Sequence, residues 1–442
     1  MLKSIKLKNY KSFGNLEADF TTSLGKPKKL IMIYGENGSG KSNLISAFFF
    51  LKNTFNSLSF QEEAYKMVEN YGLPIDNDEA LKSFLKLTRS NMTYEISDNK
   101  MIDSQDNMSI EINYIYHNDK EAIYKVEFND KQVVYESLYC QLEKNLVKTF
   151  EITSDNVYFN NNLFLSENYR KEIEEKTHKY FGKHTFLAIV FNETRLSNEK
   201  YIHDNVANSF LDALKELYDY SVWYKPAKGA EGFIKTTEIM KDILQGSIPM
   251  NIKAQLINTE EALSSYFVSL YSDIKGIHYE CKEENNRINY CLYFDKLING
   301  KIRSIPYHLE STGTIKLAKL FPYIFACLRK ETVFFDEMDS GIHDILMNQL
   351  IMNLEEQLNG QLIITTHNTM LLNNIDPEYS YVINIDVDGN KTLNCVKDFG
   401  RIQGNHNVTT RYLRGVFGGI PQPGYIDLKE IVLHKGTNNN AS

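Results

Sequence analysis

Residues 35–42 have the types and the spacing that are needed to hold a phosphate group. They read Gly-Glu-Asn-Gly-Ser-Gly-Lys-Ser and fit the pattern Gly-x-x-x-x-Gly-Lys-Ser/Thr completely. In such a loop the glycines let backbone N–H groups curl around phosphate oxygens at the start of a helix. We expect Lys41 to reach the β- and γ-phosphates and the Ser42 hydroxyl to bind Mg²⁺. The residues expected to contact a nucleotide are Gly35, Asn37, Gly38, Ser39, Gly40, Lys41, Ser42 and Asn43.

Two adjacent carboxylates, Asp336 and Glu337, follow the apolar run 332–335. Such a pair at the end of a strand is often only an exposed turn or a helix N-cap. Downstream of a complete phosphate-binding loop, the catalytic interpretation is favoured. Asp336 would then bind Mg²⁺ through its water shell, and Glu337 would orient the attacking water.

A histidine and a serine–glycine segment complete the candidate site. His367 closes the apolar run 361–366, although a lone histidine at a strand end is usually structural. Ser311, Gly313 and Thr314 stand at the start of a predicted helix, shortly before the carboxylate pair. The order of loop, carboxylates and histidine resembles that of ABC-type ATPases, in which the histidine contacts the γ-phosphate. In that arrangement the serine–glycine segment is the signature loop. A capped helix N-terminus can bind an anion, and the resemblance implies that it is offered to the nucleotide of the other subunit.

These residues must be positioned by short buried strands and by the helices that follow them. The apolar run 30–34 has the composition of a buried parallel strand, and it opens directly into the loop. We expect a helix to begin at the loop and to continue through Phe50 or beyond. Later segments alternate, with strands at 332–336 and 361–366 and helices at 345–358 and at 314–329, the last kinked at Pro322. This alternation predicts an α/β sheet, divided between the N-terminal part of the chain and the part after about residue 300.

The middle of the chain has a different pattern. Apolar and polar residues alternate in runs at 109–116, 121–128, 132–141 and 147–153, which predicts an antiparallel meander. Helical spacing returns between about residues 167 and 273, without the sustained heptads of a coiled-coil arm. Asn299-Gly300 predicts a two-residue hairpin turn. The predicted divisions are 1–55 (first part of the head, with the phosphate loop), 91–159 (meander), 160–275 (mainly helical insertion), 276–400 (second part of the head) and 401–442 (C-terminal tail).

Several motifs together give the chain a family resemblance. They are Asn9-Tyr10-Lys11-Ser12-Phe13, the phosphate loop, Ser311-Thr312-Gly313-Thr314, Phe335-Asp336-Glu337 with Asp339 and His343, and Thr365-Thr366-His367-Asn368. With these motifs the chain resembles the RecF/SMC/OLD-like group of ABC-type AAA ATPases, over roughly residues 1–55 and 300–425. Its segment 411–421 is similar to the tail of the RloA-like and abortive-infection ATPases of bacterial phage defence. The expected fold class is therefore α/β, a P-loop NTPase with an ABC-type ATPase head split by an antiparallel β segment and a mainly helical insertion.

The resemblance implies an ATPase with ATP and Mg²⁺ as cofactors, in which Glu337 and His367 act in catalysis and Ser42 and Asp336 hold the metal. It also implies an ATP-linked head-to-head dimer or a larger assembly. In a phage-defence setting the assembly would sense infection, through a phage protein or DNA, and control a separate effector such as a nuclease or toxin. Two alternatives stay open. One is a RecF/SMC-like DNA-binding ATPase in DNA repair or maintenance, and the other is a nucleotide-gated scaffold that hydrolyses ATP very slowly.

Two differences from related families disfavour a transporter subunit and a nuclease domain on this chain. Ser-Thr-Gly-Thr in place of the transporter sequence Ser-Gly-Gly-Gln disfavours a transporter subunit. OLD-like relatives carry a Toprim nuclease, and Asp386-Val387-Asp388 superficially offers its Asp-x-Asp motif. This run continues into Gly389-Asn390, which is typical of a hairpin turn, and too few residues follow His367 for a nuclease domain. We therefore expect any nuclease or toxin on a separate chain.

Composition and charge disfavour several other classes. The 442 residues carry 49 Lys+Arg against 57 Asp+Glu, a formal charge of −8, so no overall cationic field attracts nucleic acid. No apolar run reaches the roughly 20 residues that a bilayer requires, so a cytoplasmic protein without membrane contact is expected. Five cysteines without CxxC spacing argue against a disulfide framework or a zinc ribbon. The basic segment 170–184 is interleaved with glutamates, which indicates either a solvated helix face or a partner surface.

Overall fold

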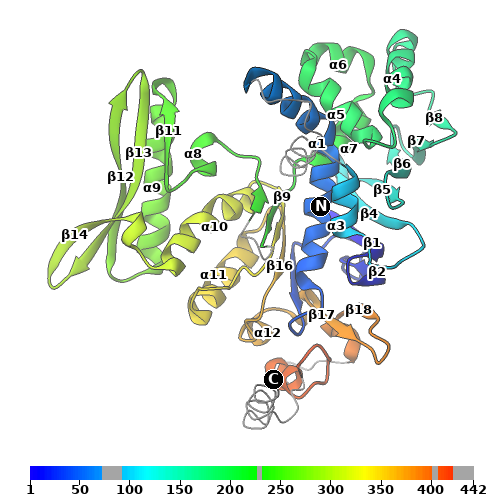
Figure 1. Cartoon of the computed structure of the whole chain (residues 1–442). Helices are drawn as coiled ribbons and strands as arrows, with labels where there is room; N and C mark the ends of the chain where they lie inside the picture. The colour runs from blue at the N-terminus through cyan, green and yellow to red at the C-terminus, as the bar shows by residue number, and fades with distance from the viewer. Residues whose placement is uncertain (72–91, 226–230, 401–406, 422–442) are drawn as a thin grey trace, which may run out of the picture.

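The computed structural model describes residues 1–71, 92–225, 231–400 and 407–421, which form three sheets with flanking helices (Figure 1). The antiparallel sheet contains β1 (Leu2–Tyr10), β2 (Phe13–Asp19), β4 (Met108–Tyr116), β5 (Lys120–Phe128), β6 (Val133–Gln141), β7 (Leu146–Thr153) and β8 (Val157–Phe159). The central sheet contains β3 (Leu30–Tyr34), β9 (Ser221–Tyr224), β10 (Glu231–Phe233), β15 (Thr332–Phe335), β16 (Gln361–Thr365), β17 (Ser380–Ile385) and β18 (Lys391–Cys395). The third sheet contains β11 (Gln245–Pro249), β12 (Ile274–Glu284), β13 (Arg287–Ile298) and β14 (Lys301–Pro306). The helices are α1 (Lys41–Tyr71), α3 (Met92–Asn99), α4 (Glu167–Tyr180), α5 (Phe186–Leu196), α6 (Glu199–Asn205), α7 (Asn208–Tyr218), α8 (Glu238–Lys241), α9 (Lys253–Leu270), α10 (Thr312–Leu328), α11 (Asp344–Gln357), α12 (Leu371–Asn374) and α13 (Val408–Leu413).

The antiparallel sheet runs in the order β2-β1-β4-β5-β6-β7-β8. In β4 every second residue from Met108 to Tyr116 is buried, and the residues between them are partly exposed. This alternation gives the sheet one covered face and one open face. The meander predicted from the sequence corresponds to β4, β5, β6 and β7, which pair in sequence order.

The central sheet runs in the order β10-β9-β15-β16-β3-β17-β18, and its five inner strands are parallel. Every residue of β3, β15 and β16 is buried, because both faces of these strands are covered. Ile31 and Ile33 belong to the core that contains α1, whereas Leu30 and Met32 belong to the core that contains α10 and α11. The predicted α/β fold class is confirmed.

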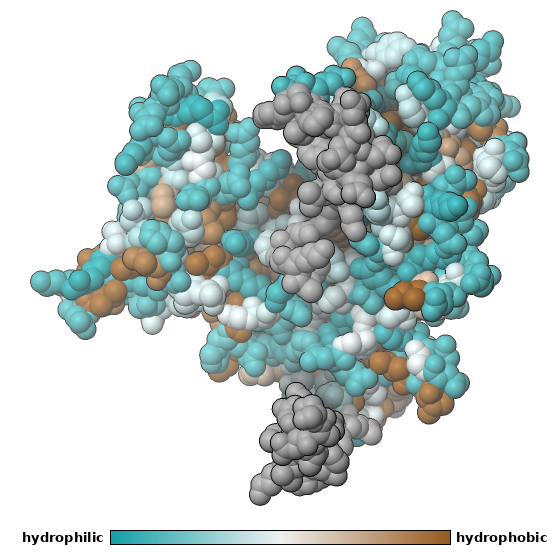
Figure 2. All heavy atoms as spheres, viewed as in Figure 1, coloured by the Kyte–Doolittle hydropathy of each residue, from teal (hydrophilic) through white to brown (hydrophobic). Residues whose placement is uncertain are grey.

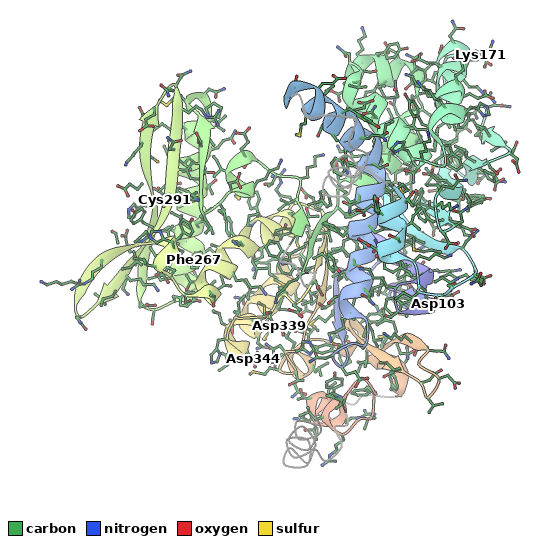
Figure 3. The ribbon with its side chains drawn as sticks, in the orientation of Figure 1. Asp103, Lys171, Phe267, Cys291, Asp339 and Asp344 are labelled. Atoms are coloured by element: carbon green, nitrogen blue, oxygen red, sulfur yellow. The ribbon has the colours of Figure 1, made fainter. Side chains whose placement is uncertain are left out.

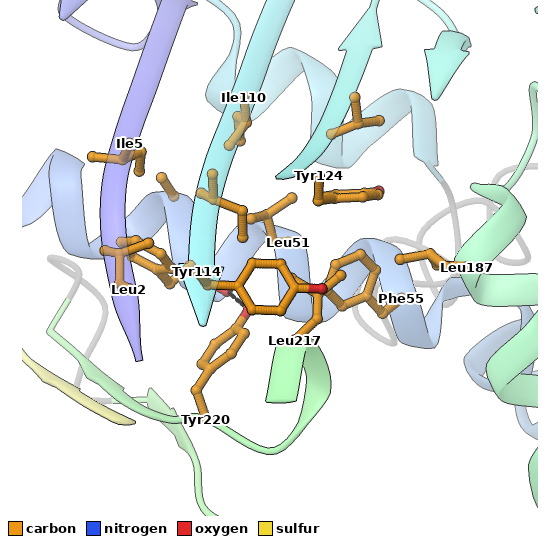
Figure 4. Close-up of a cluster of buried hydrophobic side chains, with 14 of the residues drawn as sticks. Leu2, Ile5, Leu51, Phe55, Ile110, Tyr114, Tyr124, Leu187, Leu217 and Tyr220 are labelled. Atoms are coloured by element: carbon orange, nitrogen blue, oxygen red, sulfur yellow. Dashed lines mark hydrogen bonds between the residues drawn. The ribbon is translucent and has the colours of Figure 1, made fainter. Parts of the chain in front are cut away.

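Helix α1 packs between the antiparallel sheet and the central sheet (Figure 1). Phe48 of α1 stacks on Phe334 of β15, with the ring centroids 3.6 Å apart. On the other side, Leu51 and Phe55 of α1 join the cluster of Figure 4, where Phe55 meets Tyr124 of β5 edge to face at 5.7 Å. The N-terminal half of α1 is therefore fixed by contacts with two sheets.

The third sheet forms a lobe of its own, on the left in Figure 1, and α9 covers one of its faces. Phe267 of α9 packs against Phe294 of β13 with centroids 5.2 Å apart, and Figure 3 shows Phe267 and Cys291 within this lobe. Asn299 and Gly300 have φ of 51° and 72°, as a two-residue hairpin turn between β13 and β14 requires. The hairpin carries exposed apolar side chains toward its tip, including Ile302, as the brown spheres of Figure 2 show.

Two arrangements differ from the simplest expectation from the sequence. Strand β9 lies within the segment 160–275, whose spacing predicts a mainly helical insertion, yet β9 joins the central sheet beside β15. The third sheet extends across residue 276, where the sequence places a boundary. Of the predicted tail, residues 401–406 and 422–442 lie outside the described residues. All five cysteines are free, and no helix in the described ranges is long and apolar enough to cross a bilayer.

Candidate functional site

The predicted phosphate loop connects β3 to α1. Gly40 has φ of +109°, and a Cβ built there would lie 2.8 Å from Cζ of Phe13, so the position requires glycine. The Ser39 hydroxyl is buried and has no hydrogen-bond partner within the described chain. Gly35 is buried at the end of β3, Asn37 and Gly38 are exposed, and Asn43 donates to Ser12 Oγ at 2.8 Å.

Lys41 is the first residue of α1, and its side chain is buried beneath the loop. Its Nζ donates to the carbonyl oxygens of Gly35 at 2.7 Å and Glu36 at 3.0 Å. Burial lowers the pKa of Lys41, and the carboxylates of Asp336 and Glu337 oppose this effect. The loop lysine and the carboxylate pair, far apart in the sequence, thus share one electrostatic environment.

Asp336 follows β15 directly and is fully buried. Its Oδ1 accepts a hydrogen bond from Thr365 Oγ1 at 2.7 Å, while its Oδ2 has no hydrogen-bond partner in the described part of the chain. Burial raises the pKa of Asp336, and the Thr365 hydrogen bond and the nearby Ser42 hydroxyl act against that rise. A buried carboxylate oxygen without a partner, next to a serine hydroxyl, is a donor set that fits Mg²⁺. The described residues contain no cluster of three or more His, Cys, Asp or Glu side chains able to hold a metal by themselves.

Glu337 occupies the left-handed region with φ of 47°, which is uncommon for a residue other than glycine. Its N–H donates to Thr365 Oγ1 at 2.7 Å. Its Oε2 accepts from Lys225 Nζ at 2.9 Å, and this ion pair lowers the pKa of Glu337. The carboxylate is 37% exposed, so it is ionised and reachable by solvent.

His367 comes shortly after β16. Because β15 and β16 are parallel, His367 and Asp336 lie at the same edge of the sheet, beyond the carboxyl ends of the strands. Its N–H donates to Asp339 Oδ2 at 2.9 Å, and Thr366 Oγ1 donates to the same oxygen at 2.9 Å. The side chain is exposed, yet desolvation lowers the pKa of His367 and the Lys41 ammonium lowers it further. A neutral imidazole beside the phosphate loop is therefore favoured.

The predicted signature loop lies against the turn that follows β15. Ser311 caps α10, because its Oγ accepts from the Thr314 N–H at 3.1 Å. A Cβ built on Gly313 would lie 2.7 Å from the Gly341 carbonyl oxygen, so the two backbones are in close contact. The start of α10 is therefore packed directly against the turn after the carboxylate pair.

The family model described as "AAA domain, putative AbiEii toxin, Type IV TA system" matches residues 30–373. The chain belongs to this AAA family. The prediction that the chain is a member of the AAA proteins is confirmed by this match. Among curated proteins, no sequence matches the chain.

Solved structures of the SMC and RecF type are similar to this AAA protein over most of both chains. The SMC head domain from Thermotoga maritima is 15% identical, covering 90% of this chain and 99% of that chain with a TM-score of 0.39. The SmcHead bound to the C-winged helix domain of ScpA is 13% identical, with coverages of 89% and 96% and a TM-score of 0.45. The recombination mediator protein RecF-ATPrS is 14% identical, with coverages of 89% and 98% and a TM-score of 0.37.

Three lysines at the site of this AAA protein are not predicted by the sequence motifs. Lys225 follows β9 and pairs with Glu337. Lys316 of α10 donates to the carbonyl oxygens of Glu337 at 2.6 Å and Ser340 at 2.8 Å. Lys391 of β18 donates to the Gly38 carbonyl oxygen at 3.0 Å. None of the three is itself part of a motif, although Lys316 follows the signature segment closely. Only the run 221–224 could have indicated the strand before Lys225.

The C-terminal segment 407–421 packs beside the phosphate loop. Phe417 is fully buried, and Tyr412 Oη donates to the Gly419 carbonyl oxygen at 3.1 Å. A cavity of about 370 Å³ lies between this segment, the loop and His367. The segment 407–421 therefore forms one wall of the cavity beside the phosphate loop.

The remaining candidates from the sequence lie elsewhere. Lys171 of the basic segment lies on α4, at the end of the molecule opposite Asp339 (Figure 3). In that segment Lys176 pairs with Glu172 and Glu193, each at 2.7 Å, as on a solvated helix face. Asp386 accepts from the backbone N–H groups of Asp388 and Asn390 in the β17–β18 turn, so the Asp-x-Asp run is a hairpin connection.

Proposed function

We propose that the chain is the ATP-binding and ATP-hydrolysing subunit of a bacterial anti-phage system of the abortive-infection type. The observation that carries the ATPase proposal is the meeting of Lys41, Ser42, Asp336 and Glu337 at one edge of the central sheet, with the buried Asp336 Oδ2 left unpaired. Ligands of parallel sheets bind at this edge, beyond the carboxyl ends of the strands.

Each residue has a distinct proposed role. The N–H groups of residues 35–43 and the Lys41 ammonium bind the phosphates of ATP. Ser42 and Asp336 hold Mg²⁺, which when bound offsets the negative charge of the phosphates. Glu337 orients the attacking water, and His367 contacts the γ-phosphate.

The proposed active unit contains at least two copies of the chain. Ser311, Gly313 and Thr314 of one copy would face the nucleotide held by the other. The close packing of Gly313 on Gly341 supports this role, because it would connect a partner's nucleotide to the turn that carries Glu337. Binding of ATP would then control dimerisation or a larger assembly.

The defence role rests on the family. Its description names a toxin and a type IV toxin–antitoxin system, and the segment 411–421 resembles phage-defence ATPases. We propose a cytoplasmic assembly that senses infection, through a phage protein or DNA, and controls a separate nuclease or toxin. The five-part division predicted from the sequence remains a proposal, with β9 counted in the central sheet and the boundary at residue 276 crossed by β12.

The chemistry is tested with the full chain and two substitutions. Glu337→Gln should retain ATP binding and trap the dimer without hydrolysis, whereas Lys41→Ala should lose binding and dimerisation. Lys253→Ala, in an exposed ion pair of the third-sheet lobe, is the control and should behave as the parent. Equal phosphate release by Glu337→Gln and the parent would refute the assignment of the catalytic carboxylate.

The biology is tested by purifying the Glu337→Gln protein with ATP from its native cells, with Lys41→Ala as the matched control. A stoichiometric protein partner found only with Glu337→Gln, and active as a nuclease or toxin, supports the defence assembly. DNA recovered without a protein partner would refute it in favour of a repair or maintenance ATPase.

A further inference from the structure

The carboxylate of Glu337 is held by a lysine from a distant part of the chain. Lys225 Nζ lies 2.9 Å from Glu337 Oε2 and donates to Ser340 Oγ at 3.2 Å. Within the described residues, Oε2 has this one hydrogen-bond partner and Oε1 has none. One carboxylate oxygen is therefore engaged and the other is open.

The place of Lys225 is fixed by the central sheet. Strand β9 runs parallel to β15, with Trp223 opposite Phe335, and the two rings stack with centroids 5.4 Å apart and planes 3° apart. The Asp336 N–H donates to the Trp223 carbonyl oxygen at 2.9 Å. Sheet hydrogen bonding thus places Lys225 beside the turn that begins at Asp336.

A second lysine, Lys316, contacts main-chain atoms of the same turn. Lys316 donates to the Glu337 and Ser340 carbonyl oxygens, from the first turns of α10. Its contacts set the backbone of Glu337, which has the unusual φ of 47°, but they do not reach the carboxylate. The orientation of that carboxylate is left to Lys225.

We propose that Lys225 is a positioning residue for ATP hydrolysis, which fixes Oε2 of Glu337 so that Oε1 points to the attacking water. The inference rests on the proposed ATPase function and adds a residue that the motifs do not include. Lys225 acts through Glu337 and does not contact the nucleotide. Misplacement of a reacting group by about 1 Å can cost about 100-fold in rate, so the effect is on turnover rather than on binding.

The test compares Lys225→Met, Lys225→Arg and the control Lys253→Met in the full chain. We expect Lys225→Met to lower kcat for ATP by about 10- to 100-fold while KM stays within about two-fold. Lys225→Arg should restore kcat to within about three-fold, because a guanidinium can hold the same carboxylate oxygen. Lys253→Met should have parental kcat and KM.

Other outcomes overturn the proposal. Parental or increased kcat in Lys225→Met would show that the ion pair does not position Glu337. A raised KM with unchanged kcat would place Lys225 on the nucleotide, and a Lys225→Arg variant as slow as Lys225→Met would exclude positioning through the ion pair. Absence of hydrolysis by the parent overturns the proposed function as well, whereas an active parent with an inactive Glu337→Gln isolates failure of the Lys225 proposal.

Discussion

Glu136 of β6 is a fully buried residue, and its carboxylate faces the N-terminus of α5. It accepts hydrogen bonds from the N–H groups of Phe186 and Leu187 and from Tyr124 Oη. Burial nevertheless raises the pKa of Glu136 from 4.5 to about 7. Replacement by glutamine keeps the shape and removes the titrating proton. Its single oxygen can replace only one of the two carboxylate oxygens that accept from Phe186 and Leu187, a cost that does not depend on pH.

The magnitude follows from proton linkage. A pKa displaced from 4.5 to about 7 corresponds to about 3 kcal/mol, at about 1.4 kcal/mol per pH unit. Because the folded protein holds this proton more tightly than the unfolded chain, the stabilisation is fully present below pH 4.5 and is lost as pH rises through about 7. The Glu136→Gln variant should lack this loss.

Urea unfolding followed by far-UV circular dichroism, at a series of pH values, measures the effect. Relative to Glu136→Gln, the free energy of unfolding of the parent should fall by about 3 kcal/mol between about pH 4.5 and about pH 8. Glu143→Gln, on the exposed turn between β6 and β7, is the control and should follow the parent. Parallel curves for the parent and Glu136→Gln over this range would refute the reasoning.

Three further predictions concern packing, the signature loop and acid stability. Phe334→Ala removes the ring stacked on Phe48 and should cost about 3–5 kcal/mol in the free energy of unfolding, and a loss below about 1 kcal/mol would contradict the packing. Gly313→Ala introduces a Cβ 2.7 Å from the Gly341 carbonyl oxygen, so one of the two backbones must shift, and we expect both ATP turnover and thermal stability to fall. Parental turnover would argue against the coupling. Burial lowers the pKa of His184 from 6.5 to about 4, so the unfolded chain binds the proton first and stability should be lost as pH falls from 6.5 through about 4. His184→Gln should remove this acid loss, and an unchanged acid profile would contradict it.

The sequence predicts the fold well where one segment carries its own pattern. The run 30–34 with the glycine loop, and the period-two runs that became β4 to β7, needed no distant information. Strand β9 could not be recognised in the same way. Its apolar run has four residues, a length at which a buried strand and part of a helix have the same pattern, and only pairing with β15 decides between them.

In the candidate site, too, some residues could be predicted from the sequence around them, whereas the roles of others depend on strands that are distant in the sequence. Lys41 and Asp336 could be predicted because a local motif surrounds each of them. Thr365 stands in the motif Thr365-Thr366-His367-Asn368, yet nothing local shows that it donates to Asp336 and accepts from the Glu337 N–H. Lys225, which holds Glu337, has no motif at all. Their roles arise from the order of strands in the sheet, so they become visible only when β9, β15 and β16 lie side by side.

The placement of the segment 407–421 sets a lower limit on the size of a working fragment. The family match ends at residue 373, before β17, which is the parallel neighbour of β3, and before Tyr412 and Phe417. A protein trimmed to the matched region would leave β3 without its outer partner and would expose the flank of the phosphate loop. Conversely, a dye attached at residue 421, which lines the cavity beside the phosphate loop, could report nucleotide binding by fluorescence.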